Sequence, residues 1–360
     1  MNKHHYVAIM AGGIGSRFWP MSRTNYPKQF LDILNTGKTL IQATYDRFSS
    51  FIPAENIFVV TSTEYVNIVK TQIPQIPLQN ILGEPSRKNT APCIAYISFK
   101  LLSADPGASL IIAPADHLIL DNIAFTKVCL EALSFVNKHN AFITLGIKPT
   151  SPNTGYGYIQ YEQPSVTDNV YKVKTFTEKP NLELAKTFVS SGEFLWNAGI
   201  FVWQVKNIIT AFENLLPEMH EVFYTEKDKF NTPAEAAALQ NIYPLCTNIS
   251  IDFGIMEKAD NVYVIPSSFG WSDLGTWNSA YELLNKDSHS NALASHNVMV
   301  INSKNCVVHS APEKLVVVQG MDGYIVVDTA DVLLICKKEM EQEIKEFVVE
   351  VKRNKGERYV

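Results

Sequence analysis

Short apolar runs alternate with amphipathic stretches over roughly the first 285 positions of this 360-residue chain. Four of the runs are brief, rich in β-branched residues and bounded by turn residues, which is typical of buried strands. They are Val7–Met10, Ile57–Thr61, Leu110–Ala113 and Phe142–Leu145. Strand–helix–strand alternation of this kind predicts an α/β fold, a Rossmann-like domain with a mixed, mostly parallel sheet and helices on both faces.

Two helices stand out between these strands. Thr39 and Gln42 have the spacing of a capping box at a helix start. Further along, apolar side chains recur on one helical face. They are Phe125, Val128, Cys129, Ala132, Phe135 and Val136. Ligands of such folds bind outside the carboxyl ends of the strands, so that edge is where functional residues are expected.

The pattern changes after a polar run over 285–291, which we interpret as a solvated linker. Five β-like segments follow at a spacing of roughly eight to nine residues, which predicts a small β-structure. They are Val298–Ile301, Cys306–His309, Leu315–Gln319, Tyr324–Asp328 and Val332–Cys336. A last helix carries an apolar stripe that could dock on this chain or on a partner subunit. The expected domains are therefore 1–285 and a β-rich 292–360 that ends in this helix.

Composition narrows the class of protein. A hydrophobic content of 46% with 19% charged residues is typical of globular domains, and a net charge of −5 argues against nucleic acid or an anionic membrane as partner. No apolar run reaches the ~18 residues that span a bilayer, and no signal peptide is recognisable. The five cysteines are scattered without a Cys-x-x-Cys pair, which predicts reduced thiols and a cytoplasmic location.

The first strand leads into a glycine-rich segment that could hold phosphate. Gly12, Gly13 and Gly15 expose backbone N–H groups there, and Arg17 adds a planar cation suited to phosphate oxygens. Lys28, after a proline, supplies a second cation. The spacing fits neither a dinucleotide fingerprint nor a Walker loop. The segment favours a nucleoside triphosphate, and an ordinary glycine turn that closes a strand is the alternative.

Two carboxylates could hold a metal ion. Asp116 lies just past the end of a predicted strand, and Asp273 lies in a segment rich in tryptophan and glycine. Mg²⁺ takes one or two protein carboxylates and leaves the rest of its shell to water and phosphate. A turn or helix cap is the alternative for Asp116. Asp252 and Glu257 are interpreted first as acids at a helix N-terminus and second as ligands.

A third group of residues could bind a phosphorylated sugar. Glu178 could accept hydrogen bonds from hydroxyls, and the adjacent Lys179 could hold a phosphate, although a surface ion pair would look the same. Asn197 lies among aromatic and glycine residues, a composition common in sugar pockets and also in buried turns. Gly157 belongs to a glycine- and tyrosine-rich loop that enters a strand.

Seven segments in this order resemble the nucleotidyltransferases that activate sugar 1-phosphates, most closely the mannose-1-phosphate guanylyltransferase family. They are Gly12–Arg17, Pro27–Gln29, Gly83–Pro92, Pro114–His117, Phe176–Pro180, Trp196–Phe201 and Gly270–Trp277. The resemblance covers essentially the whole chain. Ser16 replaces a common Thr, and Ala115 replaces a common Ser. Some family members carry a cupin-type isomerase domain after the transferase, which is not expected here.

The resemblance implies that GTP and mannose 1-phosphate give GDP-mannose and diphosphate, by in-line attack of the sugar phosphate on the α-phosphorus of GTP. It also implies residue roles. Arg17 and Lys28 would be catalytic; Gly12, Gly13, Gly15, Arg17, Glu84, Asn89 and Thr90 would bind the nucleotide; Asp116 and Asp273 would hold Mg²⁺; Gly157, Glu178, Lys179 and Asn197 would bind the sugar phosphate. A small C-terminal β-helix-like domain that ends in a helix would follow, often used in dimer contacts, so a homodimer is a candidate assembly.

Glu84 is the candidate for nucleotide selection in this scheme. Its carboxylate could accept from the N1–H and the exocyclic amine of guanine, which a pyrimidine lacks; an acid near a turn is the alternative. Two other functions stay open, a nucleotidyltransferase for another hexose 1-phosphate and a non-catalytic sugar-nucleotide-binding regulator. Arg17, Lys28, Asp116 and Asp273 are all present, which favours catalysis.

Overall fold

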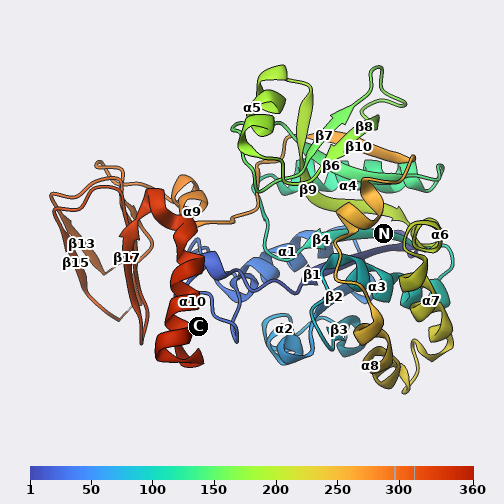
Figure 1. Cartoon of the computed structure of the whole chain (residues 1–360), viewed down its shortest axis with the longest axis horizontal. Coiled ribbons are helices and arrows are strands. Elements are labelled where there is room, and N and C mark those ends of the chain that lie inside the picture. The colour runs from blue at the N-terminus through green and yellow to red at the C-terminus, as the bar shows by residue number, and fades with distance from the viewer. Residues whose placement is uncertain (296, 312) are drawn as a thin grey trace. The chain divides into compact units, whose positions relative to one another are not determined.

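The computed structural model describes residues 1–295, 297–311 and 313–360. Its contacts group the chain into two compact units, each assembled from separate stretches (Figure 1). The first consists of residues 1–12, 45–115 and 119–271, and the second of residues 13–44, 116–118 and 272–360. Because these units are defined by contacts in space, they do not test a boundary drawn along the sequence, and the division at residues 285–292 stays a prediction.

A nine-stranded mixed sheet forms the centre of the first unit, in the order β3-β2-β1-β4-β9-β6-β10-β8-β7. Its strands are β1 (His5–Ala11), β2 (Ile57–Ser62), β3 (Ile81–Glu84), β4 (Ser109–Pro114), β6 (Phe142–Ile147), β7 (Tyr158–Tyr161), β8 (Tyr171–Thr177), β9 (Phe194–Gln204) and β10 (Val262–Ser267). The four predicted strands are therefore confirmed. β3, β2, β1 and β4 run parallel, β10 runs parallel to β6, and β9 runs antiparallel to both β4 and β6.

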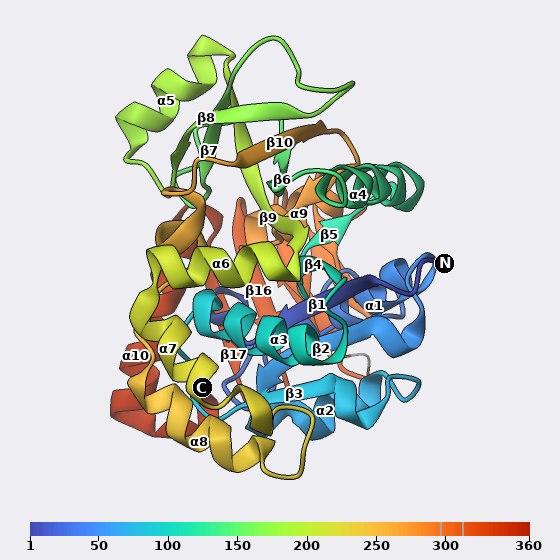
Figure 2. The same ribbon diagram turned by 90° about the vertical axis from the view of Figure 1, so that its right-hand side faces the viewer.

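Helices cover both faces of this sheet. They are α1 (Leu40–Ser49), α2 (Val66–Gln72), α3 (Thr90–Ala104), α4 (Asn122–Val136), α5 (Leu182–Ser191), α6 (Val205–Leu215), α7 (Pro217–Thr225) and α8 (Glu235–Leu245). Figure 2 shows α3 and α6 side by side along one face. Ala8 and Ile112 belong to the core cluster of that face. Their neighbours Val7 and Ile9 are equally buried but lie outside the cluster, as the two-residue period of a strand requires.

The two predicted helices are confirmed. At the start of α1, the Thr39 N–H donates to Gln42 Oε1 at 2.9 Å and the Gln42 N–H donates to Thr39 Oγ1 at 3.4 Å, which is the predicted capping box. In α4, the predicted apolar residues are buried except for Val128, which is half-buried. One alternative is wrong. Residues 196–201 form no turn and instead lie in the middle of β9, a strand of 11 residues.

The second unit contains the predicted C-terminal β-structure. Its strands are β12 (Ala292–Leu293), β13 (Val298–Ile301), β14 (Val307–His309), β15 (Val316–Gln319), β16 (Tyr324–Asp328) and β17 (Leu333–Lys337). They form one sheet in the order β12-β14-β16-β17 and a second of β13 and β15. Pairing is parallel from β12 to β14 to β16 and between β13 and β15. Successive strands from β12 to β16 therefore belong to alternate sheets.

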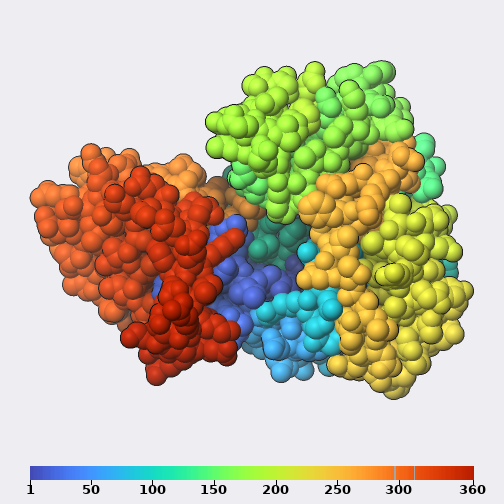
Figure 3. Space-filling view, viewed as in Figure 1, coloured from blue at the N-terminus to red at the C-terminus, as the bar shows by residue number. Residues whose placement is uncertain are grey.

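Two helices and the glycine-rich N-terminal segment complete this unit. The helices are α9 (Trp277–Leu283) and α10 (Ile344–Lys355), and the glycine-rich segment contributes two short 3₁₀ turns, η1 (Ser16–Phe18) and η2 (Lys28–Phe30). One core cluster contains Phe18, Trp277 and Ile325, with the first two rings 5.0 Å apart. The stripe of α10 packs on the same cluster through the fully buried Ile344, while its outer side is surface (red, Figure 3). The terminal helix thus docks on its own chain.

The predicted linker is only partly solvated. Residues 285–290 are exposed, as expected, but Asn291 is fully buried. Its Nδ2 donates to the Ser303 carbonyl at 3.0 Å, and its Oδ1 accepts from the Cys306 N–H at 3.1 Å. The run therefore ends in a residue that holds two turns of the β-structure together. The short strands β5 (Leu118–Ile119) and β11 (Trp271–Ser272) lie where the chain passes from one unit to the other. Across the described residues, none of the helices is both long and apolar enough to cross a membrane.

Candidate active site

The predicted site residues fall into the two units. In the second unit, Gly15 has a positive φ of 65°, and a Cβ at this position would collide with the side chain of Lys28. Both facts require glycine. Gln29 Nε2 donates to the Gly13 carbonyl at 3.0 Å, whereas a Cβ at Gly13 would meet nothing within 4 Å. The Gln29 side chain thus holds the glycine-rich loop through the Gly13 carbonyl, and the space beside Gly13 Cα is open.

Arg17 follows this loop in η1. Its side chain is half-buried, and its Nε donates to Gln342 Oε1 at 3.3 Å. Gln342 precedes α10, so a residue from the end of the chain positions the predicted phosphate-binding guanidinium. A planar guanidinium held in this way presents donors in a fixed direction, which suits a phosphate.

Lys28 is the centre of the group in the second unit. Its side chain is only 5% exposed, and its Nζ forms an ion pair with Asp116 Oδ2 at 3.0 Å. The same Nζ donates to the main-chain carbonyl of Asp273 at 2.7 Å and lies 5.8 Å from the centre of the Phe18 ring. Three residues that sequence reasoning assigned to phosphate and metal binding therefore lie together.

The charge on Asp116 is stabilised by these contacts. Burial alone would raise the pKa of its carboxyl, but the charges of Lys28 and His117 and the hydrogen bond from Lys28 outweigh burial, so the pKa is lowered. On Asp273, the Gly275 N–H donates to Oδ1 at 3.1 Å. A Cβ at Gly275 would lie 2.5 Å from Oδ2, so a larger residue there would displace the Asp273 carboxylate.

The carboxylates of Asp116 and Asp273 are oxygen ligands of the kind that Mg²⁺ prefers, and Lys28 contacts the Asp116 carboxylate and the Asp273 main-chain carbonyl. The described residues contain no cluster of three or more His, Cys, Asp or Glu side chains able to hold a metal. Two protein carboxylates are nevertheless the number Mg²⁺ commonly takes, because phosphate and water fill the remaining positions. Asp116 and Asp273 are the residues that could hold it.

Glu84 is the first of the predicted nucleotide-binding residues in the first unit. It ends β3 and is 7% exposed. Tyr243 donates its hydroxyl hydrogen to Glu84 Oε1 at 2.8 Å, and a Cβ at Gly12 would lie 3.8 Å from Oε2. Burial raises the pKa of Glu84 to about 7, against the opposing effect of the Tyr243 hydrogen bond. Gly12 and Glu84 are therefore neighbours, as a common role requires.

Asn89 and Thr90 have structural contacts at the start of α3. Asn89 caps the helix, since its Oδ1 accepts from the Thr90 N–H at 2.9 Å, and it has a positive φ of 69°. Thr90 Oγ1 accepts from the Ile251 N–H at 2.9 Å. These contacts fix the loop that follows β3. A direct role of either side chain in nucleotide binding stays a prediction.

The predicted sugar-binding residues of the first unit do lie together. Asn197 Oδ1 accepts from Thr144 Oγ1 at 2.8 Å, and its Nδ2 donates to Asp252 Oδ1 at 3.0 Å. A Cβ at Gly157 would lie 3.3 Å from Asn197 Cβ and closer still to the Glu178 carboxylate. The absence of a side chain at Gly157 therefore leaves the space into which Asn197 and Glu178 face.

Glu178 contains an unsatisfied oxygen in this space. The side chain is 8% exposed, and Oε1 pairs with the ammonium group of Lys179. Oε2 is buried and finds no hydrogen-bond partner in the part of the chain that the structure describes. A buried carboxylate oxygen without a donor is costly, so a ligand hydroxyl at this position would be favourable. Lys179 itself is 60% exposed.

Sequence reasoning missed two residues of these groups. Asp252 was interpreted as a helix N-terminal acid and does begin a π-helical turn, η7 (Asp252–Met256), but it also contacts Asn197. Burial and the charge of Glu178 raise its pKa to about 6. The flanking apolar residues could have signalled a buried acid there. Tyr243 gives no such signal, because an aromatic residue on an amphipathic helix looks like an ordinary core residue.

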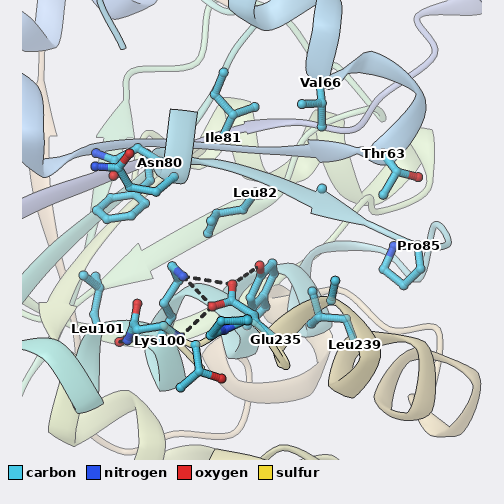
Figure 4. A pocket seen from close by; sticks show the side chains of 18 of the residues that line it. Thr63, Val66, Asn80, Ile81, Leu82, Pro85, Lys100, Leu101, Glu235 and Leu239 are labelled. Carbon is cyan, nitrogen blue, oxygen red and sulfur yellow. Dashed lines mark hydrogen bonds and ion pairs between the residues drawn. The ribbon is translucent and has the colours of Figure 1, made fainter. Parts of the chain in front are cut away.

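A cavity of about 750 Å³ lies between β3, α3 and α8 of the first unit (Figure 4). Lys100 and Glu235 form a buried ion pair of 2.6 Å at its wall. Gly83 and Pro85, which flank Glu84, also line it. None of the residues predicted for the site lines this cavity, although it adjoins the segment that carries Glu84.

Comparison with known proteins identifies the family of this chain. The model of the nucleotidyl transferase family matches residues 6–290, and that of the mannoseP isomerase/GMP-like β-helix domain matches residues 296–351. The chain belongs to the nucleotidyl transferase family. Within this family it is 34% identical to a mannose-1-phosphate guanylyltransferase of Salmonella montevideo over 96% of this chain and 73% of the relative. It is 33% identical to one of Escherichia coli over 98% and 74%.

Two solved structures share the fold of this chain. A crystal structure described as mannose-1-phosphate geranyltransferase from Thermus thermophilus superposes with a TM-score of 0.87 at 29% identity, over 97% of this chain and 99% of that one. A mannose-6-phosphate isomerase from Helicobacter pylori has a TM-score of 0.60 at 25% identity, over 74% and 99%. This nucleotidyl transferase is thus an enzyme of the mannose-1-phosphate guanylyltransferase group. The expected fold, including a C-terminal β-helix-like part that ends in a helix, is confirmed.

Proposed function

We propose that this nucleotidyl transferase converts GTP and mannose 1-phosphate into GDP-mannose and diphosphate. The names of its relatives supply the substrates. The observation that carries the chemistry is the buried Lys28, which contacts Asp116 and Asp273 at once. A lysine that touches two aspartates is suited to a reaction in which phosphate charge and a metal ion must be balanced at one place.

The reaction needs no activated side chain as nucleophile. An oxygen of the sugar phosphate, already ionised, forms a bond to the α-phosphorus of GTP, while the bond from that phosphorus to the bridging oxygen breaks and diphosphate leaves with the electron pair. Catalysis therefore consists of positioning and charge neutralisation. Arg17 and the N–H groups of Gly13 and Gly15 hold the triphosphate, and Lys28 offsets the charge that grows on the leaving diphosphate.

Asp116 and Asp273 would hold Mg²⁺, which neutralises phosphate charge when bound. The lowered pKa of Asp116 supports this role, since the carboxylate stays ionised at neutral pH. Lys28 pairs with the Asp116 carboxylate and binds the Asp273 main-chain carbonyl, while the Gly275 N–H binds the Asp273 carboxylate.

The sugar phosphate is held by residues of the first unit. Lys179, largely exposed, binds the phosphate, and the unsatisfied Oε2 of Glu178 accepts from a sugar hydroxyl. Asn197 and Gly157 shape the space around that hydroxyl. Ionised Glu84 accepts from the N1–H and the amine of guanine, with Gly12 beside it. Asn89 and Thr90 fix the segment that carries Glu84.

The experiment that tests this function measures diphosphate release from purified protein with Mg²⁺, crossing four nucleoside triphosphates with mannose, glucose and galactose 1-phosphates. Release with GTP and mannose 1-phosphate alone is the expected result. Release with another pair would keep the mechanism and overturn the substrates. No release with any pair, together with measurable binding of GDP-mannose, would leave a sugar-nucleotide-binding regulator.

A homodimer in the cytoplasm is part of the same proposal. Met299, Ile301 and Val317 are 42% to 53% exposed, and Met299 pairs with Val317 on the outer side of the β13–β15 sheet. An exposed apolar sheet of this kind suits a second copy of the chain. Light scattering should show a dimer that Val317→Glu dissociates; a monomeric parent would refute the proposed dimer.

The proposed cytoplasmic location rests on the cysteines. All five are free and buried, which supports a reducing compartment.

A further inference from the structure

Tyr243 contacts the carboxylate to which we assign guanine recognition, from an element that sequence reasoning left out of the site. Its hydroxyl donates to Glu84 Oε1 at 2.8 Å. Tyr243 is fully buried and Glu84 is 7% exposed. In such a low-dielectric environment a hydrogen bond to a carboxylate is strong and its geometry is well defined.

This hydrogen bond fixes which way the carboxylate faces. The terminal torsion of a glutamate is broad and roughly two-fold, so an unrestrained carboxylate would rotate. With Oε1 held by Tyr243, Oε2 lies toward Gly12 at the end of β1. Guanine presents two neighbouring donors and needs both carboxylate oxygens in one plane. A carboxylate oriented in advance avoids the entropic cost of ordering at the moment of binding.

The position of Tyr243 is itself set by rigid packing. Glu235, the first residue of α8, accepts from Lys100 Nζ at 2.6 Å and from the Tyr96 hydroxyl at 2.5 Å, both on α3 (Figure 4). Tyr243 lies eight residues further along the same helix, and its ring packs edge-on against Phe223 of α7, with centroids 6.4 Å apart. Helix α8 is thus fixed at its start. The Tyr243 hydroxyl near its end is held against Glu84 by packed helices and not by a loop.

We propose that Tyr243 is a positioning residue for nucleobase selection, which holds the Glu84 carboxylate in the orientation that accepts both guanine donors. The proposal rests on the proposed function, because it assumes that Glu84 reads the base. It assigns to α8 a role in choosing GTP over a nucleotide with a single donor on the same edge, such as ITP.

The ionisation of Glu84 offers a specific readout. Burial raises its pKa to about 7, and the Tyr243 hydrogen bond lowers it, so loss of that bond moves the pKa upward. A protonated carboxyl cannot accept from both guanine donors. Four other titratable groups interact with Glu84. Two lie on α3, Cys93 and Tyr96, and two come from α8 and the residue after it, Tyr243 and Cys246. The charge of Lys88 acts on Cys246.

These neighbouring groups do not titrate in the range of interest. Burial is the largest cause that raises the pKa of each of them, to about 11 for Cys246 and further for Cys93, Tyr96 and Tyr243. They therefore stay neutral between pH 6 and 9. A change in GTP binding over that range that depends on Tyr243 can be assigned to Glu84.

The experiment compares Tyr243→Phe with the parent enzyme, using GTP and ITP from pH 6 to 9 at saturating mannose 1-phosphate and Mg²⁺. In the parent, KM for GTP should rise as pH falls through about 7. In the variant this rise should begin at higher pH, and at pH 7 KM for GTP should increase about tenfold, as for the loss of one hydrogen bond to a charged group. The GTP preference over ITP should shrink, whereas kcat and KM for mannose 1-phosphate should stay within about twofold of the parent. Tyr243→Met also removes the hydroxyl and replaces Tyr243→Phe in this test if that variant folds poorly. It should show the same shift of the pH profile and the same loss of preference for GTP.

Two further variants separate the possible outcomes. Tyr281→Phe removes the hydroxyl of another buried tyrosine, which donates to the Ser290 carbonyl at 2.8 Å and not to Glu84, and should lower stability without moving the pH profile. Glu84→Gln should abolish both the pH dependence of KM and the preference for GTP. If Glu84→Gln keeps both, base recognition by Glu84 is wrong. If Glu84→Gln loses both while the Tyr243 variants match the parent, the proposal for Tyr243 alone is overturned.

Discussion

Glu84 should destabilise the protein at neutral pH, and Glu84→Gln should relieve this cost. Burial raises the pKa of the carboxyl from 4.5 to about 7 in the folded protein. The folded state therefore holds a proton more tightly than the unfolded state does, and ionisation opposes folding. The contribution of Glu84 is most favourable below pH 4.5, falls as pH rises from there to about 7, and is constant above that.

The magnitude follows from the shift. A difference of about two and a half pKa units, at 1.36 kcal/mol each, corresponds to about 3 kcal/mol. The side chain is 7% exposed, so little of this is lost to solvent screening. Glutamine has nearly the same shape, is neutral, and offers a carbonyl oxygen to the Tyr243 hydroxyl. Glu84→Gln should thus raise the free energy of unfolding at pH 8 by up to about 3 kcal/mol and leave it nearly unchanged at pH 4.5.

The assay is denaturant unfolding of parent and variant at pH 5, 6, 7 and 8, followed by circular dichroism. Because both proteins share every other titratable group, the difference between them isolates residue 84. The reasoning is refuted if the difference does not grow between pH 5 and 7, or if Glu84→Gln is the less stable protein at pH 8. Greater stability combined with loss of GTP selectivity would show a carboxylate retained for binding and not for folding.

Three further predictions concern the other groups. Asp273→Asn should lower kcat by about 10²-fold while the melting temperature changes little, since the carboxylate acts on charge that develops in the reaction; unchanged kcat would rule out a metal-binding role. Lys179→Ala should raise KM for mannose 1-phosphate and leave KM for GTP unaltered, and an equal rise in both would contradict its assignment to the sugar phosphate. Asn291→Ala should lower the free energy of unfolding by about 1–3 kcal/mol, because the Cys306 N–H and the Ser303 carbonyl lose their buried partner; calorimetry without a decrease would contradict this structural role.

The sequence predicted the parts of the fold that repeat a simple pattern. The strands that contain Val7 and Ile57 are short, and each has a continuous apolar run that is mostly buried, so the strand type could be predicted. β9 was not, because Asn197 and Gly199 interrupt its apolar run and suggest a turn. The asparagine is tolerated there since Thr144 and Asp252 satisfy its amide, which is a tertiary fact that no local pattern carries.

The site was predictable to the extent that its residues lie in recognisable motifs. Lys28, Asp116 and Asp273 belong to separate motifs, and the structure brings both aspartates into contact with Lys28. Tyr243 could not be predicted as a site residue, because its significance depends on the burial of its partner Glu84. The composition of the second unit was equally hidden. Phe18 packs against Trp277, and only the folded chain shows that its beginning and its end share one core.

The candidate carboxylates differ in what lies beside them, and this difference matches their proposed roles. Asp116 has the Lys28 ammonium within 3.0 Å, so its pKa is lowered and it stays charged. Glu84 and Asp252 are paired with neutral donors, a tyrosine hydroxyl and an amide, and burial raises their pKa values to about 7 and about 6. A carboxyl binds a metal ion in its ionised form, so a lowered pKa keeps Asp116 ready for the ion. A buried carboxylate that recognises hydrogen-bond donors destabilises the protein when it is ionised and no ligand is bound. With a pKa near 7, Glu84 can be protonated in the free enzyme and ionised when the donors of the ligand are present.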